Sequence, residues 1–282
     1  FSKTKRFFLT VDLEEWYQLL YLKKYTDFKG LDFFSLHMDE FLVYLKQNNI
    51  KITFFVLAEL ALKIPKVIER ISSDGHEIGC HGFNHELVPF KTDNEFILEL
   101  KKAKDILEKI SLQEIIGYRS PCFSLNDKKL KLLEKTAFKY DSSFIKFSNH
   151  RLYGNLDLIE YQRINSILLK NEKENFFEFQ IPTTKFFNFQ IPISGGGYLR
   201  IIPFFVFKKL FTDELKQRNE YMLFLHPFEL YPGYFKLPIN VNTKDLFRFS
   251  YGRRGNLSRV KKLLSIAKKH GYSFTLMKDE LI

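Results

Sequence analysis

Residues 51–80 read KITFFVLAELALKIPKVIERISSDGHEIGC, and this stretch indicates the fold class. Residues 51–57 form an apolar run rich in β-branched and aromatic side chains, which is typical of a buried strand. Pro65 begins a helix that ends before Gly75, and residues 76–80 form a second short strand. A strand, a helix and another strand in this order predict two parallel neighbours in one sheet.

The same unit recurs along most of the first 230 residues. Further strands are expected at residues 6–12, 116–119, 138–141 and 221–225. Helices are expected at residues 34–49, 92–110, 127–136, 203–217 and 256–270, the second of them with a Thr92–Glu95 capping box and the last with Gly271 after its end. Residues 154–192 instead carry short extended segments, which indicates a β-rich insertion. We therefore expect one α/β domain over residues 1–282.

The composition and the net charge limit the kinds of molecule that the protein is expected to bind. The 282 residues are 45% hydrophobic, which is normal for a soluble globular protein, and they carry 44 Lys and Arg against 33 Asp and Glu. A net charge of +11 is compatible with nucleic acid, a membrane surface or an anionic substrate. Because the lysines are spread over the expected helices and no nucleic-acid motif accompanies them, we favour solvated helix faces and expect no nucleic-acid partner.

The sequence carries few features that indicate a cellular compartment. Cys80 and Cys122 are too few for a disulfide framework, so they predict packing roles in a reducing compartment. No apolar run reaches the ~18 residues of a membrane span. Residues 1–9 are basic and then strand-like, without the features of a signal peptide, although a chain that starts at Phe leaves open a trimmed segment. A cytoplasmic protein is favoured, with peripheral membrane contact left open.

The strongest local signal for chemistry is the pair of histidines in His81-Gly-Phe-Asn-His85. Two imidazoles four positions apart share one face if the segment turns helically, and can then bind one metal ion. The spacing also occurs by chance, so ordinary packing roles are the alternative. The position just after an expected strand, where barrel enzymes build their sites, favours the metal.

Acidic residues end the first expected strand, in Val11-Asp-Leu-Glu-Glu15. If the extended backbone continues, Asp12 and Glu14 point to one side and Glu15 to the other. Two carboxylates on one face are suited to metal binding and to general-base catalysis. A solvated acidic loop is the alternative.

Two more polar residues stand at strand ends. Arg119, in Gly117-Tyr-Arg-Ser-Pro121, has the geometry to hold a catalytic carboxylate through a bidentate pair. His226 follows the strand at 221–225 and precedes a proline, and a histidine there suits general-acid catalysis near neutral pH. A surface arginine in a turn and a satisfied core histidine are the alternatives.

In this order the motifs resemble the polysaccharide deacetylases, the carbohydrate esterase group of chitin, peptidoglycan and nodulation-factor deacetylases. The sequence is most similar to the branch linked to bacterial exopolysaccharide and surface-polysaccharide biosynthesis. The motifs that carry the resemblance are Val11 to Glu15, Gly75 to His85, Tyr118 to Ser124, Tyr140 to Ser143, Gly195 to Tyr198 and Leu225 to Leu230.

The resemblance implies a distorted, incomplete (β/α)7 barrel and a divalent metal ion, most often Zn²⁺, bound by two histidines and a carboxylate. By motif position, His81 and His85 become ligands and Asp12 the general base. Arg119 then holds the base, and His226 is the general acid.

One departure from the family pattern concerns the third ligand. The commoner motif has two adjacent aspartates, whereas here Leu13 follows Asp12, so the ligand must be Glu14 or Glu15. Strand alternation favours Glu14, because Leu13 would point toward the core. Contacts with the substrate are expected from Pro121, Tyr198 and Leu225.

The function implied is hydrolysis of the N-acetyl group of an N-acetylated sugar, an oligosaccharide or a lipid- or nucleotide-linked glycan. The metal would activate water, Asp12 would take its proton, and His226 would protonate the departing amine. Two alternatives remain open. One is an allantoinase-like hydrolase of ureides or cyclic amides on the same fold, and the other is a non-catalytic carbohydrate-binding relative.

Overall fold

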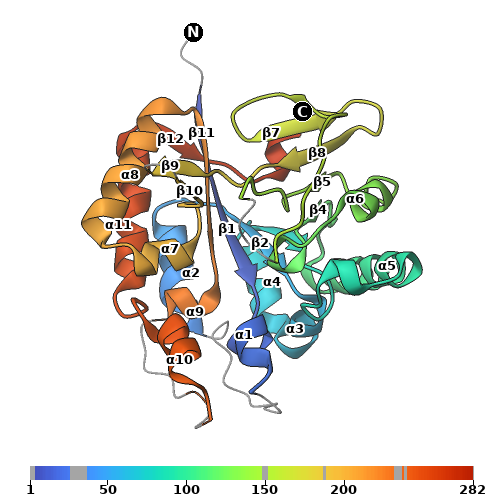
Figure 1. Cartoon of the computed structure of the whole chain (residues 1–282), viewed down its shortest axis with the longest axis horizontal. Helices are drawn as coiled ribbons and strands as arrows, with labels where there is room; N and C mark the ends of the chain where they lie inside the picture. The colour runs from blue at the N-terminus through green and yellow to red at the C-terminus, as the bar shows by residue number, and fades with distance from the viewer. Residues whose placement is uncertain are drawn as a thin grey trace.

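A computed structural model describes residues 4–25, 37–147, 152–186, 189–231, 237 and 240–281 (Figure 1). Its strands are β1 (Lys5–Leu13), β2 (Thr53–Val56), β3 (Glu77–Cys80), β4 (Gly117–Tyr118), β5 (Tyr140–Asp141), β6 (Gln162–Arg163), β7 (Leu168–Asn171), β8 (Phe176–Phe179), β9 (Thr184–Phe186), β10 (Phe189–Ile191), β11 (Glu220–Leu225) and β12 (Tyr272–Phe274). Its α-helices are α1 (Leu20–Lys23), α2 (Asp39–Gln47), α3 (Ala58–Lys63), α4 (Pro65–Ser73), α5 (Asp93–Ser111), α6 (Asp127–Leu133), α7 (Gly196–Ile201), α8 (Phe204–Gln217), α9 (Pro227–Leu230), α10 (Thr243–Ser250) and α11 (Asn256–Lys269).

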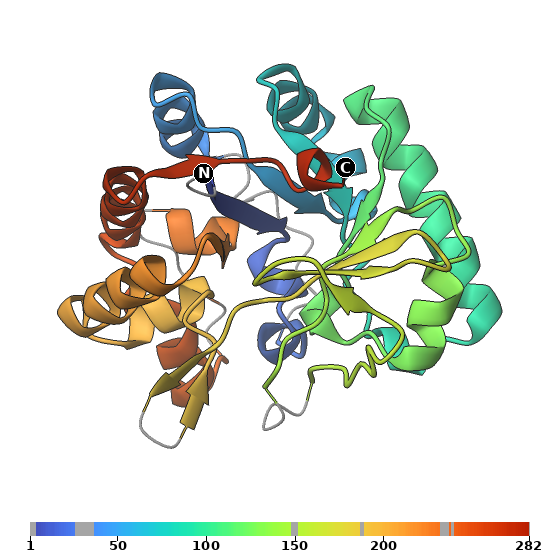
Figure 2. The same ribbon diagram turned by 90° about the horizontal axis from the view of Figure 1, so that it is seen from above.

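The strands form one large sheet in the order β11-β1-β2-β3-β4-β5-β8-β7-β6, with β12 also beside β1. Every neighbouring pair from β11 to β8 is parallel, and β8, β7 and β6 are antiparallel to one another. Helices surround the outside of the curved sheet in the view from above (Figure 2). Within the described residues β8 and β11 do not pair, so the sheet does not close. The expected distorted, incomplete (β/α)7 barrel is confirmed.

The region expected as a β-rich insertion divides into three parts. Strand β8 pairs in parallel with β5 and is therefore a barrel strand. Strands β6 and β7 extend the sheet beyond it, and β9 and β10 make a separate antiparallel pair. Strand β12, which pairs with the start of β1, was not expected from the sequence.

Side chains on β1 alternate between two apolar layers. Phe7, Leu9, Val11 and Leu13 belong to the cluster between the sheet and the helices. Phe8 belongs to a second cluster with Phe55, Tyr140, Met222 and Phe224, which lie on other barrel strands. Because side chains alternate along a strand, Thr10 and Asp12 point to the same side as Phe8, into the barrel. The inner face therefore becomes polar toward the carboxyl end of β1.

Local signals account for most helix boundaries. The capping box of α5 is present, since Thr92 Oγ1 accepts from Glu95 N at 3.3 Å and Thr92 N donates to Glu95 Oε2 at 2.7 Å. The sequence predicts Asn256 as the N-cap of the last helix, but Asn256 is already helical in α11 and Gly255, with a φ of 77°, is the N-cap. The helix predicted at residues 34–49 corresponds to α2, but Phe34 lies outside the described residues.

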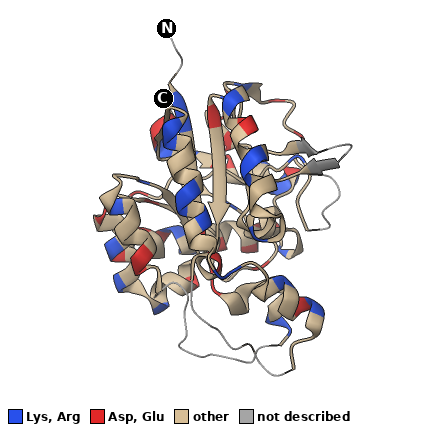
Figure 3. Ribbon diagram, turned by 90° about the vertical axis from the view of Figure 1, so that its left-hand side faces the viewer, with Lys and Arg blue, Asp and Glu red and all other residues tan. Residues whose placement is uncertain are grey.

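Charge is spread over the molecule. In Figure 3 Lys and Arg occur on several helices and loops and are mixed with Asp and Glu on the face shown. In the described part of the chain, no helix is both long enough and apolar enough to cross a membrane.

Two buried carboxyl groups face each other across β5 and β8. Asp141 and Glu178 are paired in the parallel register, both are fully buried, and their side chains are hydrogen-bonded to each other. Burial is the main cause that raises the pKa of Asp141 to about 6, and burial and the charge of Asp141 raise the pKa of Glu178 well above its usual range. The folded pair therefore retains a proton that the unfolded chain loses.

This pair predicts a stability that falls as pH rises. Both folded pKa values lie above those of the unfolded chain, so the contribution of the pair is present below about pH 4 and is lost as pH rises through the folded values. Replacing Glu178 with Gln keeps the shape and a donor toward Asp141. We expect E178Q to raise the Tm at pH 8 by about 2–4 °C, for a gain of about 1 kcal/mol, and to have less effect at pH 5.

The control is E172Q, because Glu172 is 54% exposed and its ion pair within the described residues is the surface pair with Lys170. Thermal melts of the three proteins from pH 5 to pH 8 test the prediction. An E178Q protein that loses stability with pH as steeply as wild type would contradict it.

Candidate active site

The parallel register brings the carboxyl ends of five strands, β1 to β5, to one level. Leu13 pairs with Val56, Val56 with Cys80, Cys80 with Tyr118, and Tyr118 with Asp141. The residues that follow at the carboxyl ends of β1, β3, β4 and β5 therefore emerge together. They are Glu14, His81, Arg119 and Ser142. The carboxyl end of a parallel barrel is where such enzymes hold their catalytic groups.

Glu14, His81 and His85 form a cluster that fits a metal ion. Each offers one ligand atom, these atoms lie within 4.8 Å of one another, and all three residues are buried. His81 Nδ1 is 2.8 Å from the backbone oxygen of Arg119. A carbonyl only accepts, so Nδ1 carries the proton and Nε2 is left as the ligand atom. The Glu14 carboxylate contacts His85 Nε2, and His85 Nδ1 is buried and has no hydrogen-bond partner among the residues that the structure describes.

The charge states of this cluster also suit a metal. Burial would raise the pKa of Glu14, but the neighbouring His85, His226 and His81 lower it to about 2. Burial, together with the charge of His85, lowers the pKa of His81 to about 4. At neutral pH the cluster therefore holds an ionised carboxylate and a neutral His81. Those are the forms that bind a divalent ion.

The two histidines meet for a different reason than the sequence suggested. Residues 81–85 do not form a helical turn; Gly82 has a φ of 85° and His85 a φ of 57°. The backbone oxygens of Gly82 and Phe83 accept from Ala58 N and Glu59 N at the start of α3, at 3.1 and 2.9 Å. This anchored bend brings the two rings to a centroid distance of 5.5 Å. The expected helical geometry is wrong, although the expected proximity is observed.

Glu15 has a different place from Glu14. It precedes a short 3-10 helix (Trp16–Gln18), and its backbone N donates to Gln18 Oε1 at 2.8 Å. Its side chain is buried but does not join the cluster formed by the described Glu14, His81 and His85. The geometry therefore favours Glu14 over Glu15 as the candidate third ligand.

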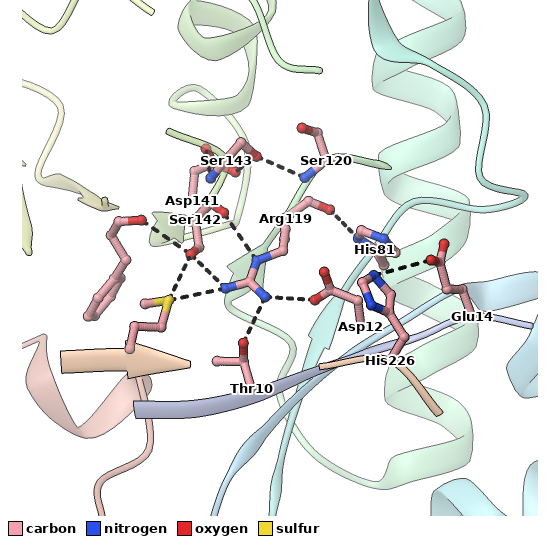
Figure 4. A network of polar contacts seen from close by, with 12 residues as sticks. Thr10, Asp12, Glu14, His81, Arg119, Ser120, Asp141, Ser142, Ser143 and His226 are labelled. Carbon is pink, nitrogen blue, oxygen red and sulfur yellow. Dashed lines mark hydrogen bonds and ion pairs between the residues drawn. The ribbon is translucent and has the colours of Figure 1, made fainter. Parts of the chain in front are cut away.

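Arg119 and Asp12 form an ion pair inside the barrel (Figure 4). Arg119 Nη1 donates to Asp12 Oδ1 at 2.6 Å and to Thr10 Oγ1 at 2.8 Å. Its Nε and Nη2 instead donate to Ser142, at 3.1 Å to the backbone oxygen and 2.9 Å to Oγ. The expected bidentate pair is therefore wrong: Nη1 alone binds the carboxylate and also Thr10, and Nε and Nη2 bind Ser142.

The loop after Arg119 is held from β5. Ser143 Oγ accepts from Ser120 N at 2.8 Å and donates to Asp141 Oδ1 at 2.7 Å (Figure 4). The guanidinium of Arg119 lies 4.1 Å from the centroid of the Phe55 ring. These contacts fix the loop that begins at Arg119 and contains Pro121.

His226 lies between two carboxylates. Its Nε2 is 3.4 Å from Glu14 Oε1, and its Nδ1 is 3.2 Å from Glu229 Oε2. Burial would lower the pKa of His226, but the hydrogen bond and charge of Glu229, with the charges of Glu14 and Asp12, raise it to about 9. A protonated histidine at this place can give up a proton.

Glu229 and Arg200 are polar residues near the site that the sequence reasoning missed. Arg200 Nε donates to Glu229 Oε1 at 3.1 Å, and both residues are buried. A sequence signal for Glu229 existed: Pro227 after His226 marks a helix start, and the third residue of a helix often turns back to its cap. No local signal indicated Arg200, which is 29 residues away.

A cavity of about 1170 Å³ opens above this group. Glu14, His85 and His226 line it, and so does Tyr198, one of the expected substrate contacts. Pro121 is buried and does not line the cavity, and neither does Leu225, whose side chain lies in the core between sheet and helices. Alternation along β11 explains this, since Phe224 and His226 point to the cavity side. A side-chain contact of Leu225 with substrate is therefore not supported.

Two family models match the chain. Residues 30–140 match the model described as Polysaccharide deacetylase, and residues 142–281 match the one described as Domain of unknown function (DUF3473). His81, His85 and Arg119 lie in the first range and His226 in the second.

The chain is also similar to known proteins. Over 87 residues it is 33% identical to a peptidoglycan-N-acetylglucosamine deacetylase of Bacillus cereus, which covers 31% of this chain and 32% of that relative. The chain thus aligns with about a third of the length of this curated relative. A Mycobacterium smegmatis protein proposed as a polysaccharide deacetylase has a TM-score of 0.66 at 17% identity, over 100% of this chain and 91% of that one. A CE4 family pseudoenzyme from Bacillus anthracis has a TM-score of 0.56 at 12% identity, over 100% and 67%. At such identities the likeness of structure shows the fold alone.

The cluster predicts which acidic residue is needed for metal binding. Protein stripped with a chelator and titrated with Co²⁺ should bind about one ion in wild type. We expect E14Q to lower the affinity for Co²⁺ at least tenfold. Loss of a residue that only hydrogen-bonds to a metal ligand already lowers metal affinity by about 10–100-fold. E15Q should leave the affinity unchanged. Loss of Co²⁺ binding in E15Q with retention in E14Q would reverse the assignment.

Proposed function

Since the chain carries a polysaccharide deacetylase family domain, we propose that it is a metal-dependent hydrolase that removes the N-acetyl group from an N-acetylated sugar. One observation carries this proposal. A three-residue ligand cluster, an arginine-bound aspartate and a histidine acid candidate lie together at the carboxyl ends of the barrel strands, and Glu14, His85 and His226 of this group line the cavity.

The proposed ligands of the divalent ion are Glu14, His81 and His85. Two imidazoles and one carboxylate suit Zn²⁺ and leave positions for water and substrate. When bound, the ion would supply Lewis-acid activation of water and of the acetyl carbonyl.

Asp12 is the proposed general base. Asp12 is 2% exposed and its Oδ1 accepts from Arg119, so its orientation is fixed without competition from bulk solvent. Asp12 takes the proton of the attacking water as the C–O bond forms. The bond between the acetyl carbon and the sugar nitrogen then breaks, and its electron pair stays on the nitrogen.

His226 is the proposed general acid, because an amine leaves poorly unless its nitrogen is protonated. His226 lies across Glu14 from His85 and lines the cavity. Transfer of its Nε2 proton to the departing nitrogen yields acetate and a free amino sugar.

The cavity supports a substrate larger than a single sugar. Its volume of about 1170 Å³ lies above the ~300–1000 Å³ of most small-molecule sites. Tyr21, Tyr153 and Tyr198 line it and offer flat apolar faces to sugar rings. We propose an N-acetylated oligosaccharide or a lipid- or nucleotide-linked glycan of a surface polysaccharide. The exopolysaccharide branch and the cytoplasmic location stay predictions.

We also propose that the chain works as one catalytic unit. The base candidate lies on β1, the ligand candidates follow β1 and β3, and Arg119 follows β4. The acid candidate follows β11, which is paired with β1. The two matched ranges of the chain therefore contribute to the same site.

Turnover is the direct test. With Zn²⁺ supplied, wild type should release acetate from N-acetylated sugars, with tetra-N-acetylchitotetraose as the first of a panel. D12N should lose about 10²–10⁴-fold in kcat while binding one metal ion, because Asp12 is not among the ligand candidates.

The other outcomes are distinct. Retained turnover in D12N would remove the base assignment. Opening of allantoin without acetate release would favour the ureide hydrolase, and saturable sugar binding without any turnover would favour a carbohydrate-binding relative.

A further inference from the structure

We propose that Glu229 is a positioning residue for His226, and that Arg200 and Gly196 keep Glu229 in place. The effect of this arrangement on catalysis rests on the proposed deacetylase function. The placement of the ring does not, and it can be measured separately.

Glu229 contacts His226 at two points. Its Oε2 accepts from the backbone N of His226 at 3.0 Å and lies 3.2 Å from Nδ1 of the ring. The carboxylate is 99% buried, so water does not compete for these contacts. An ionised carboxylate only accepts, and it therefore keeps a proton on Nδ1. The other ring nitrogen, Nε2, is then directed toward Glu14 and the cavity.

Arg200 determines which way the carboxylate points. Its Nε donates to Glu229 Oε1 at 3.1 Å, leaving Oε2 for His226. Its Nη1 donates to the backbone oxygens of Phe249 and Tyr251, at 3.1 and 2.9 Å. Arg200 is therefore fixed to the end of α10, and it holds Glu229 from the side opposite to the histidine.

Gly196 explains part of the triple-glycine run at residues 195–197. A Cβ on Gly196 would lie 2.0 Å from Glu229 Oε2 and 2.6 Å from its Cδ, so any other residue would displace the carboxylate. A Cβ on Gly197 would meet nothing within 4 Å, and neither glycine has a positive φ. The two adjacent glycines both lie in α7, but Gly196 adjoins Glu229 whereas Gly197 lines the cavity, so an alanine at Gly197 is the control for the placement of the His226 ring.

The arrangement has a chemical consequence for the proposed reaction. A Gln at position 229 cannot accept from both Arg200 Nε and His226 without turning an N–H₂ group toward one of these donors. The ring of His226 would then lose its fixed orientation or its Nδ1 proton. Proton delivery to a departing amine should suffer, whereas binding of the substrate should not.

The activity test compares two leaving groups in the metal-loaded full chain. An amine needs a proton to leave, but the 4-nitrophenolate of 4-nitrophenyl acetate does not. We expect E229Q to lower kcat on tetra-N-acetylchitotetraose by about 10–100-fold, part of the usual contribution of a general acid, with KM unchanged. Turnover of 4-nitrophenyl acetate should stay at the wild-type rate, and E172Q should match wild type on both substrates. Equal losses on both substrates, or no loss on either, would overturn the proposal.

The ring itself is the second readout. In protein labelled with ¹⁵N-histidine, the two ring nitrogens of His226 can be assigned by loss of their signals in H226Q. Wild type and G197A should show the same Nδ1-protonated pattern, and both G196A and E229Q should change it. Identical patterns in all four proteins would overturn the proposal. If wild type releases acetate from no sugar, the deacetylase function fails, but this comparison still decides the role of Glu229.

Discussion

The buried guanidinium of Arg119 is the constraint on which the site depends. Its side chain is fully buried among aromatic rings, where an unpaired charge would cost about 3–5 kcal/mol. Asp12 supplies the opposite charge, and Thr10 and Ser142 accept its remaining hydrogen bonds. One cation therefore joins β1, β4 and the end of β5 inside the barrel. The orientation of the candidate base follows from the neutralisation of that charge.

Glu14 links the ligand cluster to the acid candidate. One of its oxygens contacts His85 and the other lies 3.4 Å from His226. His81 is oriented through the backbone oxygen of Arg119, so the ligand cluster and the Arg119–Asp12 pair are in direct contact. The ligand cluster, the Arg119–Asp12 pair and the acid candidate His226 are thus connected by direct contacts. A displacement of Arg119 would therefore change the positions of all three.

A second network orients His226 from the opposite side. Arg200, Glu229 and the end of α10 form it, and Gly196 leaves room for the carboxylate. Arg119 belongs to the range that matches the polysaccharide deacetylase model, and Arg200 to the range that matches DUF3473. Each arginine holds one carboxylate, that of Asp12 on β1 or that of Glu229 on α9.

The sequence by itself determined a parallel α/β sheet and the order of polar residues at its strand ends, and the resemblance to the polysaccharide deacetylases implied the barrel. The sequence did so because burial and alternation can be inferred from local sequence. The residue types of KITFFVL predict a buried strand, and alternation from Asp12 favours Glu14 over Glu15. Tertiary structure decided the contacts between distant segments. The bend at Gly82 and His85, the division of Arg119 among Asp12 and Ser142, and the approach of Arg200 to Glu229 depend on loops and on the curvature of the sheet. Leu225 faces the core for the same reason, since the packing of β11, not its composition, selects which side of the strand meets the cavity.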